Sequence, residues 1–236
     1  TTVYSYPVSK HCMRKESISM REQIIRSVMD KKVIAIMRGM EPASCVSTAK
    51  ALLAGGICHV EVTFDQKSND CRKTADAIEA IIEELPREMR VGAGTVLTLE
   101  QVDIAAKAGA EYIISPDVNE GVIRHTIEMG LVSMPGALTP SEVMAAHRYG
   151  ADFVKLFPAG NMGASYIKAV RAPISHVKLL AVGGVSAENA KAFITAGCVG
   201  VGVGGNLVNK EWIERGEFEK ITQAAREIID AVASEK

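Results

Sequence analysis

Short runs rich in Val, Ile and Leu recur along the chain, and longer stretches with helical spacing of apolar residues lie between them. Uninterrupted apolar runs of this kind are typical of parallel strands that are buried on both faces. We therefore expect eight strands, spaced roughly 20–30 residues apart, at 33–37, 59–64, 90–94, 112–115, 131–134, 152–157, 178–182 and 200–203.

Helix start and stop signals fall in the intervening stretches. Thr98 and Thr139 each begin a four-residue sequence of the capping-box form, completed by Gln101 and Glu142. Pro140 occupies the first helical position, where the missing N–H costs nothing. The pattern predicts further helices at 44–53, before a double glycine, at 70–84, at 186–196 and at about 212–233.

Eight strands that alternate with eight helices leave little room for a second domain in 236 residues. The pattern predicts a single α/β domain, a (β/α)8 TIM barrel, over residues 20–236. An open doubly wound sheet is the alternative, although no GxGxxG sequence opens the first helix. Residues 1–19 are polar, lack the apolar core of a signal peptide and are expected to form a disordered extension outside the fold.

The composition is that of an ordinary soluble globular protein, with 47% apolar residues, 23% charged residues and a net charge of -1. It gives no reason to expect a nucleic-acid or membrane partner, and no apolar run is long enough to span a bilayer. The 5 cysteines are scattered without a CxxC pair, as expected of free thiols in the reducing cytoplasm. None of the 5 histidines has a metal-ligand spacing, so we predict no metal and no other cofactor.

Lys155 stands in the middle of an otherwise apolar strand, between Val154 and Leu156. Lysine is rarely buried unless it is paired or functional. Strand alternation places Lys155 on one face with Phe153 and Phe157. If that face is the barrel interior, desolvation disfavours the ammonium form and frees an amine that can form a Schiff base with a ketone. A lysine that extends to the end of its strand is the alternative.

Glu61 shows the same anomaly in the second strand, between Val60 and Val62. An acid and an amine inside one barrel form a natural catalytic pair, in which the amine attacks a carbonyl and the carboxylate moves protons. A buried salt bridge between Glu61 and Lys155 is the structural alternative.

Residues that follow four other strands complete the expected site, because active sites of such barrels lie at the carboxyl ends of the strands. Gly183–Gly184 and Gly204–Gly205 follow the seventh and eighth strands, where loops often bind phosphate through backbone N–H groups. Thr95, after the third strand, is placed to hold a carboxylate. Arg38 ends the first strand, where it can clamp a carboxylate or pair with Glu61.

Motifs spread over residues 21–208 resemble those of the bacterial aldolases that cleave 2-dehydro-3-deoxy-6-phosphogluconate, its galactonate epimer and 4-hydroxy-2-oxoglutarate. Each motif is weak alone, but all of them in order, at barrel spacing, make the resemblance specific. They are IMRG at 36–39, EVTF at 61–64, GAGTV at 92–96, ISP at 114–116, PGALTPSE at 135–142, KLFPA at 155–159, VGGV at 182–185 and GVGG at 202–205.

This resemblance implies a class I aldolase, usually a homotrimer, that releases pyruvate and glyceraldehyde 3-phosphate from a phosphorylated 2-oxo sugar acid. It implies that Lys155 forms the Schiff base and that Glu61 is the general acid/base, acting through a water. Arg38 and Thr95 would hold the pyruvate carboxylate, and the two glycine pairs would cradle the phosphate.

Some positions depart from the family pattern or bear on specificity. Asp65 stands where many members have Arg, so Arg38 is expected to carry more of the carboxylate contact. Val182 stands where members specific for the gluconate-derived substrate have Thr, and it resembles the galactonate-type branch. Asn206 replaces a Ser and still offers a donor to a phosphate oxygen, and Phe157 is expected to influence specificity from beside Lys155.

Three other functions remain open at this level. The first is a 4-hydroxy-2-oxoglutarate aldolase with the same Schiff-base chemistry. The others are a phosphosugar epimerase and a non-catalytic phosphosugar-binding barrel, both of which share the glycine pairs but give no reason to place a lysine inside the sixth strand.

Overall fold

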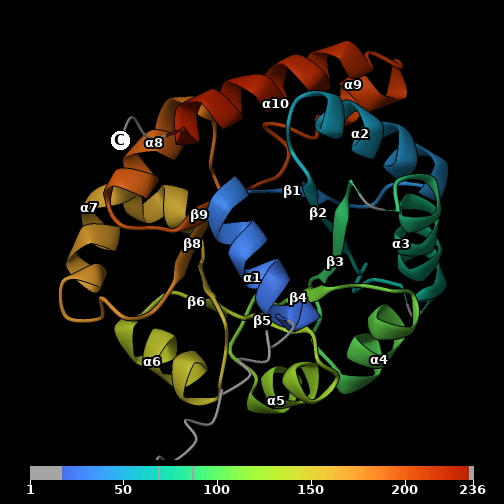
Figure 1. The fold of residues 1–236 in the computed structure, drawn as a ribbon. Helices are drawn as coiled ribbons and strands as arrows, with labels where there is room; N and C mark the ends of the chain where they lie inside the picture. The colour runs from blue at the N-terminus through green and yellow to red at the C-terminus, as the bar shows by residue number, and fades with distance from the viewer. Residues whose placement is uncertain (1–17, 69, 87, 234–236) are drawn as a thin grey trace, which may run out of the picture.

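The protein is a parallel β/α barrel, in which helices surround a ring of short strands (Figure 1). The computed structural model describes residues 18–68, 70–86 and 88–233. The expected extension at 1–19 lies outside these residues, apart from Ile18 and Ser19. The strands run β1 Val33–Met37, β2 His59–Thr63, β3 Arg90–Gly94, β4 Tyr112–Ile114, β5 Val132–Met134, β6 Gly136–Ala137, β7 Val154–Leu156, β8 Leu179–Val182 and β9 Gly200–Val203.

The ring closes through β5 and β6: β5 falls within the fifth expected strand at 131–134, and β6 continues just beyond it. The hydrogen-bonded order is β5-β4-β3-β2-β1-β9-β8-β7-β6, and all the pairs are parallel. Only Pro135 separates β5 from β6; it has no N–H to donate, but its carbonyl accepts a 2.9 Å bond from the N–H of Lys155. The prediction of a barrel is therefore confirmed, and the open doubly wound sheet is wrong.

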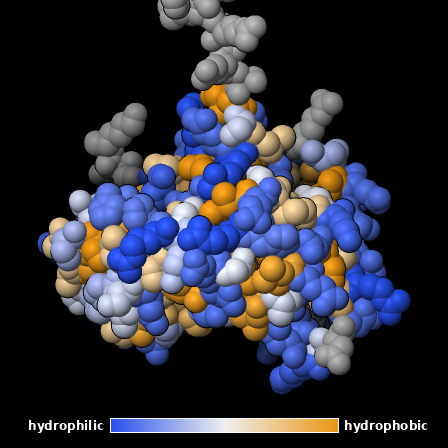
Figure 2. Space-filling model, turned by 90° about the horizontal axis from the view of Figure 1, so that it is seen from below, coloured by the Kyte–Doolittle hydropathy of each residue, from blue (hydrophilic) through white to orange (hydrophobic). Residues whose placement is uncertain are grey.

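The helices follow the strands in the expected alternation. They are α1 Met20–Lys31, α2 Pro42–Ala54, α3 Arg72–Glu84, α4 Leu99–Lys107, α5 Glu120–Glu128, α6 Pro140–Arg148, α7 Ala159–Arg171, α8 Ala187–Thr195, α9 Lys210–Glu214 and α10 Phe218–Val232. No helix in the described part of the chain is long and apolar enough to cross a membrane. On the face that Figure 2 shows, polar residues are interspersed with small apolar patches.

Local sequence signals explain most helix ends. The capping box of α6 is complete, because Thr139 accepts the N–H of Glu142 while the Glu142 carboxylate accepts the N–H of Thr139. In α4 only the first half forms, since the Gln101 side chain accepts from Leu97 rather than from Thr98. The single last helix expected at 212–233 is wrong: the chain turns at Gly216, whose φ of 70° is left-handed, and divides into α9 and α10.

Alternation along each strand divides the apolar residues between two layers. Val60, Val62 and Val154 pack outwards against the helices, as part of the larger core. A second cluster fills the lower part of the barrel interior, and Ile24 and Val28 of α1 belong to it. Figure 1 shows α1 crossing the centre of the ring, so this helix covers the barrel at the amino ends of the strands. The opposite, carboxyl end is left for the site.

Candidate active site

A cavity of about 560 Å³ lies at the carboxyl ends of β1, β7, β8 and β9. All the predicted site residues except Glu61 and Asp65 line it. They are Arg38, Thr95, Lys155, Phe157, Val182, Gly183, Gly184, Gly204, Gly205 and Asn206. The structure thus brings together residues from five segments that are far apart in the sequence.

Lys155 projects from β7 into the barrel and reaches this cavity. Its neighbours Val154 and Leu156 face the helices, so alternation leaves the lysine side chain on the interior. Only 5% of Lys155 is exposed. The Nζ atom lies 5.3 Å from the centre of the Phe157 ring, a distance at which the ring face attracts a cation. A primary amine is therefore held in a confined, partly apolar wall.

Glu61 lies deeper, inside the barrel, with 1% of its surface exposed. Burial raises the pKa of the Glu61 carboxyl, and the nearby charges of Lys155 and Arg38 oppose that shift. Among the described residues, no group donates a hydrogen bond to its Oε1 atom. A carboxyl with a raised pKa and an uncommitted oxygen is suited to exchanging protons with a bound molecule.

Thr95 enters the cavity wall because the backbone turns sharply after β3. Its φ of 55° lies in the left-handed region, which is unfavourable for a β-branched residue and costs roughly 1–3 kcal/mol. The Gln66 side chain steadies this turn by donating a 2.7 Å hydrogen bond to the Thr95 carbonyl. Strain of this kind is retained mainly where a side chain must occupy a particular place.

The two glycine pairs form adjoining loops at one side of the cavity. Gly183 and Gly184 have φ values of 90° and 70°, which glycine adopts without strain. Asn206 donates a 2.8 Å hydrogen bond from Nδ2 to the carbonyl of Val185 and so joins the loop after β9 to the loop after β8. This bond uses one amide proton of Asn206, and the second is left for a ligand. The loops present backbone to the cavity, as an anion site requires.

Arg38 is exposed at the end of β1. No ion pair joins Arg38 to Glu61, both of which lie in the described part of the chain, so the pairing alternative is not observed. The guanidinium also borders a smaller cavity of about 180 Å³ beside α9. Arg38 is therefore available to an anionic ligand in the main cavity.

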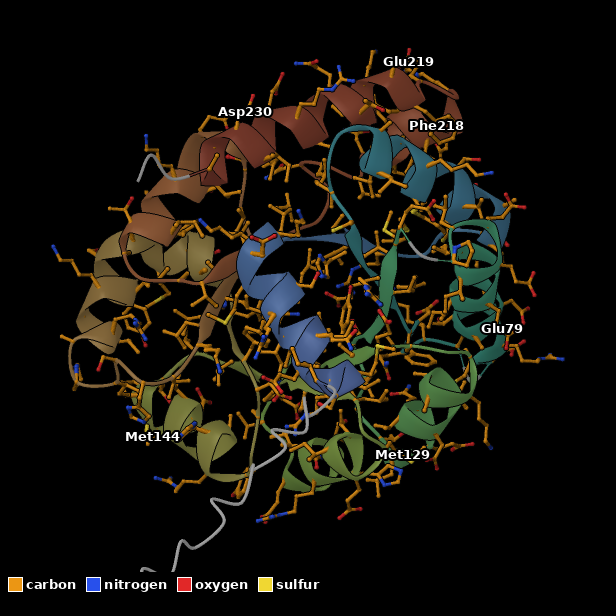
Figure 3. The ribbon with its side chains drawn as sticks, in the orientation of Figure 1. Glu79, Met129, Met144, Phe218, Glu219 and Asp230 are labelled. Atoms are coloured by element: carbon orange, nitrogen blue, oxygen red, sulfur yellow. The ribbon has the colours of Figure 1, made fainter. Side chains whose placement is uncertain are left out.

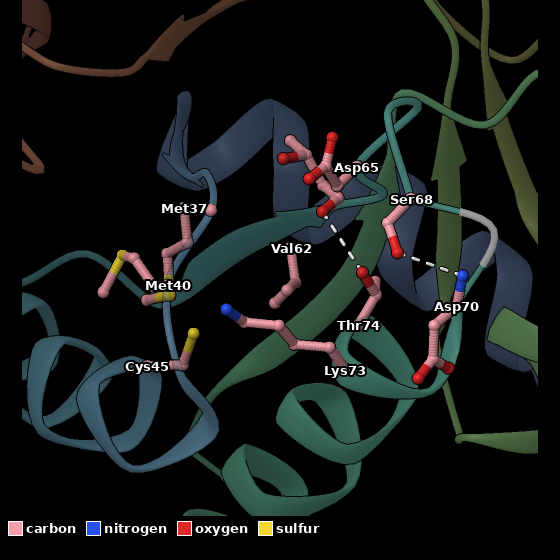
Figure 4. Close-up of a pocket in the computed structure, with 11 residues that line it drawn as sticks. Met37, Met40, Cys45, Val62, Asp65, Ser68, Asp70, Lys73 and Thr74 are labelled. Carbon is pink, nitrogen blue, oxygen red and sulfur yellow. Dashed lines mark hydrogen bonds between the residues drawn. The ribbon is translucent and has the colours of Figure 1, made fainter.

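Asp65 lies outside the main cavity. It lines a neighbouring cavity of about 310 Å³ between the ends of β1 and β2 and the helices α2 and α3 (Figure 4). Its carboxylate accepts a 2.9 Å bond from the N–H of Lys67 in the turn that follows β2. In Figure 4 the Lys73 side chain crosses this cavity, and it is ion-paired with Glu41. Asp65 does not line the main cavity, so it could affect specificity only indirectly.

The main cavity is also lined by apolar residues that the sequence analysis did not predict as site residues. Ile36, Pro116, Val185 and Val208 line it. Apolar residues at strand ends look the same in a sequence whether they face a core or a ligand, so no signal separates these four. The described residues contain no group of three or more His, Cys, Asp or Glu side chains that could hold a metal ion.

A parallel barrel with a buried amine and a buried carboxyl at the carboxyl end of its strands is a barrel enzyme, since catalytic groups of this fold lie there. The sequence profile described as "Aldolase: KDPG and KHG aldolase" matches residues 24–224. The chain belongs to this family of aldolases and is a lyase.

Individual relatives agree with this assignment. The chain is 36% identical over 176 residues to the 2-dehydro-3-deoxy-6-phosphogalactonate aldolase of Escherichia coli K12, covering 74% of this chain and 83% of the relative. It is 36% identical over 199 residues to the KHG/KDPG aldolase of the same organism, covering 84% and 89%. The solved structure of the Legionella pneumophila KDPG aldolase superposes with a TM-score of 0.78 at 28% identity, covering 86% and 97%.

Proposed function

We propose that this protein is a class I aldolase that cleaves a 2-dehydro-3-deoxy-6-phospho-aldonate to pyruvate and glyceraldehyde 3-phosphate. The observation that carries the proposal is Lys155, a buried amine in the wall of the main cavity, with the buried Glu61 directed into the same barrel. The Legionella relative was captured with pyruvate as a covalent carbinolamine intermediate, which is the first adduct of this chemistry.

The reaction begins when the neutral Nζ of Lys155 attacks the C2 ketone of the substrate. The ketone oxygen takes up a proton, and the carbinolamine that results loses water to give a protonated imine. Glu61 supplies and removes the protons of these steps, directly or through one water, because it is the buried carboxyl inside the same barrel as Lys155.

Carbon–carbon cleavage follows from the imine. The C4 hydroxyl loses its proton to the base, the C3–C4 bond breaks, and its electron pair moves into the enamine as glyceraldehyde 3-phosphate leaves. Protonation of the enamine at C3 and hydrolysis of the imine then release pyruvate and restore the Lys155 amine. The protonated imine is the electron sink, so the scheme needs neither metal nor cofactor.

The charges and backbone of the cavity fit the two anionic ends of this substrate. Arg38 and Thr95 hold the carboxylate next to the reacting ketone. The N–H groups of the loops at Gly183–Gly184 and Gly204–Gly205 hold the phosphate, with the second amide proton of Asn206. The buried Val182 packs near the hydroxyl-bearing carbons and offers no hydrogen bond, which favours the galactonate-type epimer.

Borohydride trapping tests the proposal. Pyruvate and borohydride are added to the wild-type protein, and peptide masses are mapped. We expect a reduced pyruvyl adduct on Lys155, absent from Lys155→Ala. If wild-type protein binds phosphosugars but no lysine carries an adduct, the Schiff-base function is wrong and the epimerase or binding barrel replaces it. An adduct combined with cleavage of 4-hydroxy-2-oxoglutarate alone would keep the chemistry and change the substrate.

We also propose that the protein is a cytoplasmic homotrimer. Met162, in the first turn of α7 and outside the main cavity, is a large apolar side chain with 38% of its surface exposed. Light scattering measures the mass in solution: three times the 25.2 kDa of one chain is the expected result, and a monomer contradicts it.

A further inference from the structure

Two glycines of β3 face the barrel interior, and each leaves a notch filled by a side chain from a neighbouring strand. A Cβ atom placed on Gly92 would lie 2.0 Å from the Tyr112 ring. A Cβ atom placed on Gly94 would lie 1.7 Å from Oε1 of Glu61, and the three nearest atoms all belong to Glu61. Both distances are far below van der Waals contact, so no other residue fits either position with its neighbours in place.

The strand register shows which way Glu61 points. The Cα of Glu61 is paired with Gly92, and that of Thr63 with Gly94. The carboxyl nevertheless lies against Gly94, two residues further towards the carboxyl end of the barrel. The Glu61 side chain therefore leans along the strand towards the main cavity, rather than straight across the barrel.

Tyr112 blocks the Glu61 side chain from turning towards the closed end of the barrel. Its ring occupies the notch at Gly92, its own partner in the β3–β4 register, next to the Glu61 backbone. The ring is fixed because its hydroxyl donates a 2.6 Å hydrogen bond to the carbonyl of Val60. The space into which the carboxyl of Glu61 could fold back, towards the closed end of the barrel, is thus already filled.

We infer that Gly94 is a positioning residue for the aldolase reaction. Because Gly94 has no side chain, the Glu61 carboxyl can lie against its Cα, and the Tyr112 ring prevents the carboxyl from turning towards the closed end of the barrel. This inference rests on the proposed role of Glu61 as acid/base. The backbone of Gly94 does not lie in the left-handed region, so alanine is compatible with its conformation, and the three atoms nearest to an added Cβ all belong to Glu61.

Gly94→Ala separates the two catalytic groups. The added methyl displaces the carboxyl and leaves Lys155 untouched, so borohydride trapping of pyruvate on Lys155 should persist. Exchange of the C3 protons of pyruvate with solvent depends on the acid/base, and we expect it to fall by about 10²–10³-fold, together with kcat. A kcat and an exchange rate equal to those of wild type would overturn the inference.

A double-mutant cycle on melting temperature tests the same contact without relying on catalysis. Gly94→Ala should lower the melting temperature in wild type but not in Glu61→Ala, where the carboxyl is gone. Gly55→Ala is the control: its methyl would meet Ala225 at 2.4 Å, between α2 and α10 and away from Glu61, so its cost should be the same in both backgrounds. Additive effects of Gly94→Ala and Glu61→Ala would overturn the inference.

The cycle also covers a variant that does not fold. If Gly94→Ala is insoluble while Glu61→Ala/Gly94→Ala folds, the conflict with Glu61 is established; if neither folds, the inference is wrong. A wild-type protein that shows no pyruvate adduct refutes the proposed function, whereas the melting-temperature cycle still decides whether Gly94 seats the Glu61 carboxyl.

Discussion

Glu61 and Lys155 enter the barrel from opposite sides of the ring. Glu61 lies on β2 and Lys155 on β7, and β1, β9 and β8 separate these strands along one arc. Both side chains are almost fully buried. Figure 3 shows that side chains also occupy the space between the strands and the surrounding helices. In the proposed mechanism, a substrate bound between Glu61 and Lys155 would present one face to the amine and the other to the carboxyl, so the nucleophile and the acid/base would not compete for the same approach.

Replacing Glu61 by the isosteric glutamine should abolish proton transfer without disturbing packing. We expect Glu61→Gln to lower kcat by about 10²–10⁴-fold, the range of a lost general acid/base. Lys155 remains, so the pyruvate adduct should still form, more slowly. Steady-state pyruvate release measures the first effect and borohydride trapping the second. Near-normal kcat would assign the proton transfers to another group.

The free energy of unfolding should depend on pH through the Glu61 carboxyl. Burial raises the pKa of Glu61 above its ordinary 4.5. Between 4.5 and the folded-state pKa, the folded protein binds more protons than the unfolded chain, so the free energy of unfolding falls as the pH rises through this window. Glu61→Gln has no carboxyl at this position, so its free energy of unfolding should not fall in this window for this reason.

Thermal melts of wild type and Glu61→Gln across the pH range measure this difference. We expect the melting temperature of Glu61→Gln minus that of wild type to increase as the pH rises above 4.5. This difference should become constant above the folded-state pKa of Glu61. If this difference instead decreases with rising pH, the charges of Lys155 and Arg38 lower the pKa of Glu61 by more than burial raises it.

Much of this site follows from strand alternation alone. Lys155 and Glu61 are identifiable because a charged residue inside a short apolar run has only two faces to choose from, and both are buried in a parallel barrel. The glycine pairs are identifiable because they follow the last two strands, whose carboxyl ends meet at the site. These inferences need only the order and spacing of residues.

Other features depend on packing between distant residues, which no local pattern contains. Gly216 ends α9 because the chain adopts a left-handed turn there, and the amphipathic pattern of 212–233 continues through it. Asp65 follows β2 in sequence, but the turn after Phe64 directs it to the neighbouring cavity. The seat of Glu61 depends on the register of β2 and β3, which is set by the closed ring.

The two glycine loops should respond differently to alanine. At Gly184 a φ of 70° makes any side chain strained, by about 1–2 kcal/mol, so Gly184→Ala should lower the melting temperature as well as activity. At Gly205 an added Cβ meets nothing within 4 Å, so Gly205→Ala should fold normally.

The Gly205 methyl would instead occupy space at the mouth of the phosphate site. We expect Gly205→Ala to raise KM for the phosphorylated substrate by about tenfold, the equivalent of one lost hydrogen bond to a charged group. KM for a non-phosphorylated analogue provides the control and should not change. An equal rise for both substrates would place the phosphate elsewhere.

Val182 should determine the preference between the two epimers. Its apolar side chain lines the cavity where a hydroxyl could bond a substrate hydroxyl. Val182→Thr supplies that hydroxyl at nearly the same volume. We expect kcat/KM for the gluconate-derived substrate to rise about tenfold relative to its galactonate epimer, the value of one neutral hydrogen bond. An unchanged ratio would show that another residue discriminates the epimers.

The ion pair between Arg21 and Asp152 should hold α1 over the closed end of the barrel. Arg21 Nη2 lies 2.8 Å from Oδ1 of Asp152, whose Oδ2 accepts a 3.0 Å bond from the N–H of Ser133. The Asp152 side chain is only 7% exposed, so removing Arg21 leaves a buried charge without its cation. Arg21→Ala should therefore lower the free energy of unfolding by about 1–3 kcal/mol.

Arg26 of the same helix provides the control, because it pairs with Glu22 on the exposed surface. An exposed pair four residues apart contributes only about 0.3–0.5 kcal/mol, so Arg26→Ala should be close to neutral in denaturant unfolding. Equal losses from the two variants would mean that the stability of α1 comes from helix content rather than from its attachment to Asp152, just before β7. A larger loss in Arg21→Ala, with kcat preserved, would show that the closed end of the barrel holds the fold while the open end performs the reaction.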